Sequence, residues 1–527
     1  MPSARRPSRL TLAVLGLLML ASAIVIQHAG HGLIFFYDEW DFITRRRGFS
    51  ADSLLDGHNG HLSVFPVALY KLLLQIAGLG AYWPYRLTLV CLHLLAGALL
   101  FVVLRSRVGD AAAVCGAALL LFLGSAADDL IWAFQIGFVG SIAAGLGMLV
   151  ALDRRSRGGD LAAAVLLGVS LGCSSLGVSF LAIAVIEPVV QRDWRRLARV
   201  VAAPLALYLA WRAKYGESDL MAGNLDDAPA YAFQMLAAAV GGVTGLGATA
   251  GPTLAVLVLL GLAWGTARSA PSPRLLAVLA GAVSLWGLTA LARAQLADPG
   301  AARYLYASVV LVLLAAAELW PRGVVLRGRA LAVAGVATAI AVLGNLLPLN
   351  QKADALRANS EHVKARVSAL QLAEVEVAPD YRPAPEAAPQ IEAGPYLAAV
   401  RDFGSPAQSE RALISDQEPD RLVADVVLSQ IVPPVTRPAT ARGALRGCTA
   451  FAAGSDVPLP PEGSIVLAAP DGGEPAQLLL RRFANGTIVS PLATVAPGER
   501  LAVTTAPDGI DQAWAVRVSA AVRACSA

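Results

Sequence analysis

Long apolar runs separated by short polar loops fill the first two thirds of the chain. The first run, Leu10 to Ile26, is uninterrupted and follows arginines at positions 5, 6 and 9. Runs of this length cross a membrane as helices. Further crossings are expected near 82–104, 110–125, 131–152, 160–174, 176–190, 199–215, 252–267, 274–292, 304–320 and 330–347. The pattern therefore predicts eleven membrane-spanning helices, and the shorter run 62–77 predicts an interfacial or re-entrant helix.

The pattern changes after Leu347. We expect Pro348 to end the last span, 351–372 to form an amphipathic helix and 378–389 to be a Pro-rich linker. Beyond about residue 391 no run is long enough to span. Alternating apolar and polar residues with Asp-Gly and Asn-Gly turns predict antiparallel β structure, best matched by a small sandwich. The expected strands are 464–468, 477–483 and 501–505. The predicted domains are 1–350, 351–390 and 391–527.

Composition supports this organisation. Of the 527 residues, 56% are hydrophobic and only 15% are charged, and the mean hydropathy is +0.60. These values indicate a mainly α polytopic membrane protein with an additional β-rich domain. The net charge of +4, with arginines spread over loops, argues against a nucleic-acid partner.

Arginines recur in alternate loops, for example Arg154 and Arg155, then Arg195 and Arg196. Under the positive-inside rule these loops and the N-terminus lie in the cytoplasm. Eleven crossings of a bacterial cytoplasmic membrane then place the C-terminal domain outside. In that oxidising compartment Cys448 and Cys525, which bracket the β region, are expected to form a disulfide.

The first outer loop, residues 36–61, concentrates ionisable side chains. Asp38, Glu39 and Asp41 follow the first helix, and Asp38 and Asp41 would share one face of a helical turn. A carboxylate at the water boundary with arginines nearby is suited to deprotonate a hydroxyl acceptor while a phosphate leaves. The alternative is an ordinary solvated loop.

Basic groups and histidines complete this loop. Arg45 and Arg46, with Arg47, break the positive-inside pattern, and binding of a phosphate or an anionic lipid headgroup would explain them. His58 and His61 are three residues apart. Ligation of a divalent metal together with the acids stays open beside a positioning role for the two rings.

Two later outer loops add candidates for substrate binding. Asp128 and Asp129 precede Gln135, and the acidic pair serves equally well as a helix cap. Arg303 and Tyr304 stand where a helix re-enters from outside, so the arginine can pair with a phosphate oxygen. A snorkelling arginine beside boundary aromatics is the alternative.

Taken together, these motifs resemble a known family. An acidic motif after the first helix, an HNGH segment leading into an interfacial helix, Tyr85-Arg86 opening the next span and a late Arg-Tyr loop are similar to the GT-C superfamily of membrane glycosyltransferases. The layout resembles protein mannosyltransferases and lipid A aminoarabinose transferases. The chain also resembles a group of actinobacterial membrane proteins with DEWDF and HNGH motifs.

The resemblance implies transfer of a sugar from a polyprenyl-phosphate donor to an outer-face acceptor, a cell-wall glycan or a lipid, with inversion at the sugar carbon. Asp38 would be the base with Glu39 or Asp41 as its neighbour, and Arg303 would hold the donor phosphate. The DEWD motif has three carboxylates, so the choice of base stays open, as does a need for metal.

Two other functions fit the same charges. A transporter or flippase of lipid-linked saccharide would bind with them without reacting, although transporters usually place ionisable groups near the midplane and show internal repeats. The third possibility is a non-catalytic cell-envelope protein whose role lies in the β domain. In that case we expect the first loop to tolerate substitution.

Overall fold

The structure is a computed structural model that describes residues 7–218, 220–321, 323–373, 375–439, 446–486 and 490–526. Arg5 and Arg6, which entered the topology argument, lie outside this set. The chain forms two compact units. The membrane unit comprises 1–32, 46–76 and 82–356, and the C-terminal unit comprises 33–45, 77–81 and 357–527.

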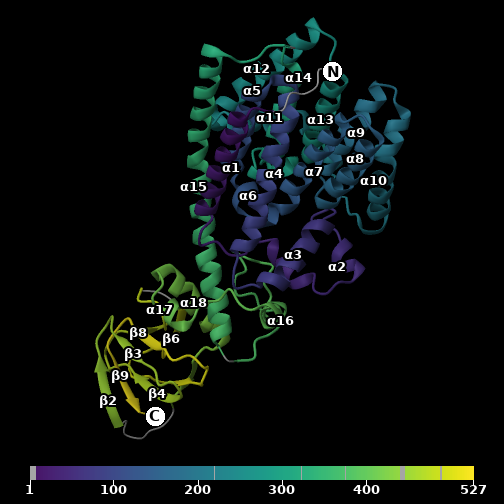
Figure 1. Ribbon diagram of the computed structural model, residues 1–527. Coiled ribbons are helices and arrows are strands. Elements are labelled where there is room, and N and C mark those ends of the chain that lie inside the picture. The colour runs from purple at the N-terminus through teal and green to yellow at the C-terminus, as the bar shows by residue number, and fades with distance from the viewer. Residues whose placement is uncertain are drawn as a thin grey trace. The chain divides into compact units, whose positions relative to one another are not determined.

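Helices make up the membrane unit. They are α1 (Arg9–Ala29), α2 (Ala51–Leu55), α3 (Val64–Ala77), α4 (Trp83–Val108), α5 (Asp110–Leu121), α6 (Ala127–Ile131), α7 (Ile136–Asp153), α8 (Arg157–Cys173), α9 (Gly177–Val190), α10 (Trp194–Tyr215), α11 (Ala228–Val243), α12 (Gly247–Arg268), α13 (Pro273–Arg293), α14 (Ala302–Leu319) and the first part of α15 (Gly328–Leu372). Figure 1 shows α7, α8 and α9 packed side by side.

Eight helices of the described chain are long and apolar enough to cross a membrane, so the protein is a multi-pass membrane protein. The shorter helices α3, α9 and α11 are apolar as well. The predicted helices 160–174 and 176–190 are present as α8 and α9, which are joined by a short turn. Helix α11, which is apolar and has 16 residues, was missed. The predicted total of eleven crossings stays a prediction.

Small residues and buried ion pairs hold these helices together. Cβ atoms added at Gly145 and Gly281 would come within 2.3 Å of Phe180 and 2.8 Å of Ile183, so glycine permits the close approach of α7 and α13 to α9. Arg274 binds Glu187 at 2.6 Å and Asp153 at 2.8 Å. Arginines that the hydropathy pattern assigned to loops thus also link helices.

Pro348 does not end the last span, and that prediction was wrong. α15 continues through Pro348 to Leu372 as one 45-residue helix. A helical proline loses one backbone hydrogen bond, and packing offsets this because Leu349 and Ala353 are buried on the membrane unit. The Asn345 side chain also accepts from the Ser125 N–H and donates to the Gly242 carbonyl, each at 2.9 Å. The predicted helix 351–372 is present, as part of α15.

The C-terminal unit begins with helices and ends in strands. Its helices after α15 are α16 (Ala393–Phe403), α17 (Glu410–Ile414) and α18 (Glu418–Ile431). Its strands are β1 (Val435–Pro438), β2 (Arg446–Phe451), β3 (Asp456–Pro458), β4 (Gly463–Ala468), β5 (Ala476–Arg481), β6 (Ser490–Val495), β7 (Arg500–Thr505), β8 (Ala515–Val518) and β9 (Val522–Ser526). The β structure therefore starts near 435, after about forty residues that are mainly helical.

Two antiparallel sheets, ordered β1-β7-β4-β9-β2 and β3-β8-β5-β6, share one buried core. This confirms the predicted antiparallel, sandwich-like architecture. Trp514, buried among Phe483, Val516 and Val518, belongs to that core. The predicted disulfide between Cys448 and Cys525 is confirmed and joins the paired strands β2 and β9. Asp425 on α18 accepts the N–H groups of residues 482 to 484, which fastens this helix to the end of β5.

Candidate active site

The acidic segment Phe36–Arg45 folds into a helical turn of the C-terminal unit, which we call the acidic turn. Backbone N–H groups of Glu39, Trp40 and Asp41 donate to the carbonyls three residues earlier at 3.0–3.2 Å. Residues Asp41–Arg45 continue as one π-helical turn. The Thr44 hydroxyl donates to the Trp40 carbonyl at 2.7 Å. This wound backbone gives successive carboxylates different surroundings.

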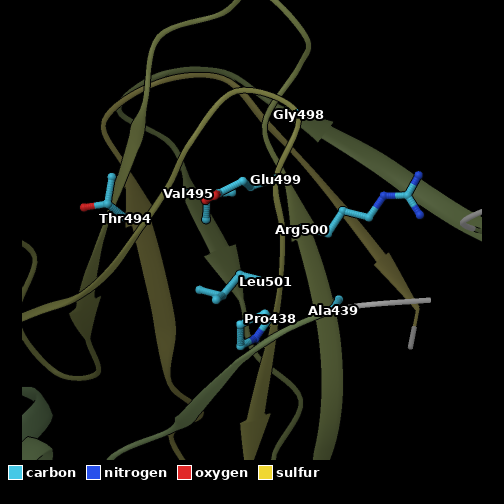
Figure 2. Close-up of a pocket in the computed structure, with 8 residues that line it drawn as sticks. All are labelled: Pro438, Ala439, Thr494, Val495, Gly498, Glu499, Arg500 and Leu501. Atoms are coloured by element: carbon cyan, nitrogen blue, oxygen red, sulfur yellow. The ribbon is translucent and has the colours of Figure 1, made fainter. Parts of the chain in front are cut away.

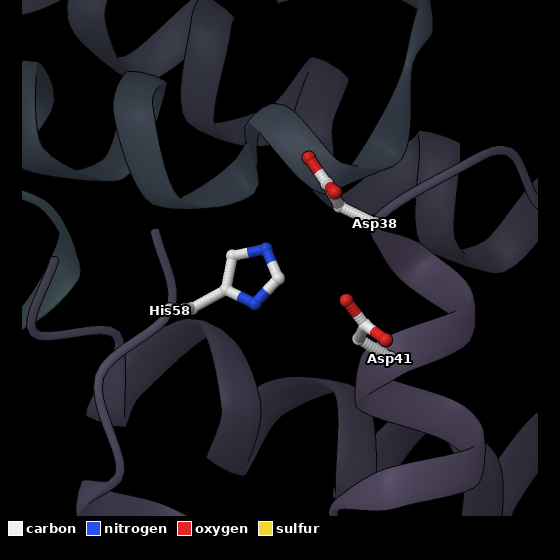
Figure 3. Close-up of side chains that lie close together, drawn as sticks. All are labelled: Asp38, Asp41 and His58. Atoms are coloured by element: carbon white, nitrogen blue, oxygen red, sulfur yellow. The ribbon is translucent and has the colours of Figure 1, made fainter. Parts of the chain in front are cut away.

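Burial separates the three acids. Glu39 is fully buried, and its Oε2 accepts the Phe36 N–H at 2.7 Å. Asp38 and Asp41 are half-buried, and their carboxylate oxygens come within 4.8 Å of each other. Figure 3 shows these two aspartates on the turn. Of the three predicted catalytic residues, Glu39 is thus engaged in stabilising the turn, whereas Asp38 and Asp41 are only partly buried.

The predicted phosphate-binding arginines have different surroundings. Arg45 is exposed and its Nε lies 3.3 Å from Asp41 Oδ1. Arg46 belongs to the membrane unit, where its guanidinium donates to the carbonyls of Asp56 at 2.7 Å and Gly57 at 2.8 Å. Arg46 therefore braces the loop, and Arg45 is the more accessible cation.

The HNGH motif is a two-residue hairpin in the membrane unit. His58 and His61 exchange both backbone hydrogen bonds, at 3.0 and 2.9 Å. Asn59 and Gly60 have φ of +50° and +76°, the left-handed conformation that an Asn-Gly pair tolerates best. The ring centroids of His58 and Phe134 are 5.3 Å apart, and those of His61 and Phe138 6.0 Å apart. The motif thus determines how both imidazoles are presented.

Lys71 on α3 is a residue that sequence reasoning missed. It is buried and donates to the carbonyls of Arg46 and Gly48 and to Ser53 Oγ. It closes the second half of the first loop onto α3. A single lysine in a helix that is otherwise apolar was the available signal, because such a side chain needs polar partners.

A second polar group lies inside the membrane unit, and we call Asp128, Asp129, Arg303 and Lys352 the Asp129 cluster. Lys352 Nζ lies 2.9 Å from Asp128 Oδ1. Asp129 is fully buried, and within the described part of the chain neither of its carboxylate oxygens has a hydrogen-bond partner. It interacts electrostatically with Arg303. The structure thus brings together Asp129 and Arg303, which were predicted from separate loops, and adds Lys352.

The two remaining predicted residues flank this cluster. Gln135 is 1% exposed, and its Oε1 has no hydrogen-bond partner among the described residues. Arg303 Cζ lies 5.2 Å from the centroid of the Tyr304 ring, a cation–π contact within α14. Tyr304 also packs beside Tyr231 and Met235. The cap proposed for the acidic pair is not seen, since α6 has no side-chain cap bond.

One buried pair within the spans was also missed. His93 Nδ1 lies 2.9 Å from the Tyr306 hydroxyl, and His93 Nε2 lies 3.2 Å from the Leu121 carbonyl. Both side chains are fully buried. The membrane interior is therefore less empty of ionisable groups than the hydropathy pattern suggested.

The β sandwich offers one cavity of about 560 Å³ beside β1 and β7. Figure 2 shows its eight lining residues, which include Pro438, Glu499 and Arg500. None of the eight is aromatic, whereas sugar-binding surfaces commonly present aromatic faces. The cavity therefore gives no independent reason to assign glycan binding to this unit.

Comparisons with known proteins add little to this geometry. No protein-family model and no curated protein matches the chain. One solved structure that is similar is the crystal structure of ArnT from Cupriavidus metallidurans bound to undecaprenyl phosphate. The identity is 17%, the TM-score is 0.45, and the match covers 69% of this chain and 81% of that chain. A likeness of this size leaves the function to be argued from the residues themselves.

Proposed function

We propose that the protein is a membrane glycosyltransferase of the GT-C kind. It transfers a sugar from a polyprenyl-phosphate donor to a cell-envelope acceptor on the outer face of the cytoplasmic membrane. The N-terminus is then cytoplasmic and the C-terminal unit extracytoplasmic. The observation that carries the proposal is the pair of half-buried carboxylates, Asp38 and Asp41, within 4.8 Å of each other just after the first apolar helix.

In this mechanism one aspartate of the acidic turn takes the proton of the acceptor hydroxyl. The acceptor oxygen bonds to the sugar carbon, the bond from that carbon to the donor phosphate breaks, and the configuration inverts. We assign the base to Asp38, the position that the family resemblance implies, and treat Asp41, which lies 3.3 Å from Arg45, as its neighbour.

The phosphate needs cations. Arg303 and Lys352 in the membrane unit supply two, and Arg303 offers the planar fork that binds phosphate oxygens in pairs. Asp128 and Asp129 offset part of this charge. Arg45 is the third candidate, and its exposure suits a lipid headgroup or an acceptor phosphate.

A divalent metal is an open part of the proposal. Two carboxylate oxygens within 4.8 Å of each other fit a hard cation such as Mg²⁺ or Mn²⁺, and Asp38 and Asp41 would hold it. The ion would supply charge for the leaving phosphate. Treatment with a chelator separates the two cases. If transfer is lost and added Mn²⁺ restores it, the reaction requires the ion. If transfer is unchanged, the aspartates act without a metal.

The experiment measures transfer of radiolabel from a panel of polyprenyl-phosphate-linked hexoses and pentoses to endogenous envelope acceptors. Membranes carry wild type, Asp38→Asn, Arg303→Ala or the control Asp56→Asn, at matched protein levels. Asp56 is an exposed carboxylate of the same loop. Transfer that is lost with Asp38→Asn and kept with Asp56→Asn supports the proposal. Equal transfer by the wild type and all three variants contradicts it.

The second candidate is a transporter or flippase of lipid-linked saccharide. The buried His93–Tyr306 pair and the buried Asp129 favour it, because ionisable groups inside the membrane are costly and commonly mark a transport path. It predicts that labelled lipid-linked sugar changes sides of the membrane without reaching an acceptor. If the wild type transfers no sugar, and His93→Phe no longer moves the lipid-linked sugar across the membrane, the transporter hypothesis would be favoured over the glycosyltransferase.

A further inference from the structure

The acidic turn is part of the C-terminal unit, although more than three hundred residues separate the two in sequence. The Ile34 N–H donates to Ser360 Oγ on α15 at 3.3 Å. Phe35, Phe42 and Ile43 are at most 2% exposed. The acidic turn is thus packed into a unit most of whose residues come from position 357 onward.

One aromatic contact lies at the centre of this arrangement. Trp40 stands between Glu39 and Asp41 in the chain and is fully buried. Its ring centroid is 5.7 Å from that of Tyr396 on α16 and 5.6 Å from that of Phe35, both at edge-on angles. Its Nε1 donates to the Phe35 carbonyl at 3.2 Å. Any shift of Trp40 therefore moves the backbone that carries Asp38 and Asp41.

Tyr396 is itself fixed on its far side. Gln371 Nε2 donates to the Tyr396 hydroxyl, and Gln371 Oε1 accepts from Ser405 Oγ at 2.8 Å. Burial raises the pKa of the Tyr396 hydroxyl, so it stays neutral. The ring is thereby held between α15 and the loop after α16, with one edge against Trp40.

A second attachment sets the other end of α16. The Leu79 N–H donates to the Phe403 carbonyl at 2.8 Å. Gly78 has φ of +64°, and a Cβ there would lie 2.4 Å from the Phe403 carbonyl oxygen, so only glycine permits this approach. Both early segments that belong to the C-terminal unit, 33–45 and 77–81, thus contact α16.

We propose that α16, through Tyr396, positions the acidic turn, so that the C-terminal unit is an integral part of the catalytic apparatus. Tyr396 touches no reacting atom and acts through Trp40. This inference rests on the proposed function of Asp38. Because misplacement of a catalytic group by about 1 Å costs on the order of 100-fold in rate, loss of this packing should appear in kcat.

The test compares two buried aromatic residues of the same unit that are changed to leucine in the full-length protein. Tyr396→Leu removes the ring beside Trp40. Phe483→Leu removes a ring of similar burial in the sandwich core, 4% exposed, that is no part of this contact. We expect Tyr396→Leu to lower kcat about 10- to 100-fold with the donor KM within about twofold, and Phe483→Leu to keep kcat per folded molecule.

The conservative variant Tyr396→Phe keeps the ring and loses only the hydroxyl bond to Gln371. It should recover kcat to within about fivefold of wild type, which a simple loss of stability at this site would not predict. Tyr396→Phe also allows a test if Tyr396→Leu does not fold. In that case Gln371→Met removes the hydrogen bond between residues 371 and 396 by changing its donor, and its kcat should equal that of Tyr396→Phe.

Asp38→Asn is measured in parallel. Loss of transfer in Asp38→Asn with wild-type kcat in Tyr396→Leu would overturn the positioning role and leave the proposed function standing. Wild-type transfer in Asp38→Asn would instead remove the proposed function. Equal losses of kcat in Tyr396→Leu and Phe483→Leu would also overturn the positioning role, because they would show a general effect of loosening the unit.

Discussion

The acidic turn and the Asp129 cluster both set aspartates beside cations, yet they differ in exposure. Asp38 and Asp41 are half-buried, and Arg45 beside them is exposed. Asp129 is fully buried in the membrane unit next to Arg303. A carboxylate that takes a proton from an acceptor must be reachable, whereas one that tunes a cation can be enclosed. The comparison therefore supports the roles proposed above, base chemistry for the first group and phosphate binding for the second.

The largest effect is expected at the acidic turn. Asp38→Asn keeps the size of the side chain and removes its basicity, so kcat for sugar transfer should fall about 10²- to 10⁴-fold. The fall in kcat should be smaller for Asp41→Asn, because Asp41 is paired with Arg45. Initial rates at saturating donor measure both. A larger loss in Asp41→Asn would exchange the roles of the two aspartates.

The next effect concerns the cations of the Asp129 cluster. Arg303→Ala should raise the donor KM about tenfold or more, since a charge-assisted bond to phosphate contributes about 1.5–3 kcal/mol. Donor titrations measure it, with Arg293→Ala, an arginine just before the same loop, as the control. A fall in kcat at unchanged KM would contradict a role in ground-state binding.

A smaller effect of opposite sign is expected at Asp129. Asp129→Asn removes the charge that offsets Arg303 while it retains the side-chain volume, so the donor should bind a few-fold more tightly and KM should fall. The same chemical change thus abolishes turnover at Asp38 and tightens binding at Asp129. The same donor titration measures this change in KM. A loss of transfer in Asp129→Asn as large as that in Asp38→Asn would contradict the distinction between the two regions.

The smallest effect is expected at Arg45. Its guanidinium is 55% exposed, and exposed ion pairs contribute about 0–1 kcal/mol. Arg45→Gln should therefore change kcat by no more than about threefold and reduce the dependence of the rate on salt. A loss of tenfold or more would show that Arg45 binds the transferring phosphate directly.

Local chemistry accounts for what could be predicted at the candidate site. The acidic residues, the HNGH hairpin and Arg303 are recognisable because unusual polar groups stand out against apolar runs. Lys352 and Tyr396 were not recognisable, since each lies in a helix whose composition is ordinary. Glu39 could not be told apart from Asp38 and Asp41, because burial and a bond to the Phe36 N–H distinguish it only in the folded turn.

Hydropathy and alternation along the chain determined the apolar helices and the antiparallel strands, because each depends on periodicity or composition within short segments. The Cys448–Cys525 disulfide could be predicted because these two cysteines bracket the β region. Tertiary packing decided the rest. It carried α15 through Pro348 and placed Lys352 beside Asp128. It also put residues 33–45 in the C-terminal unit against Tyr396. Contacts between residues hundreds of positions apart leave no periodic trace, so burial and pairing of the same side chains emerge only when the chain is folded.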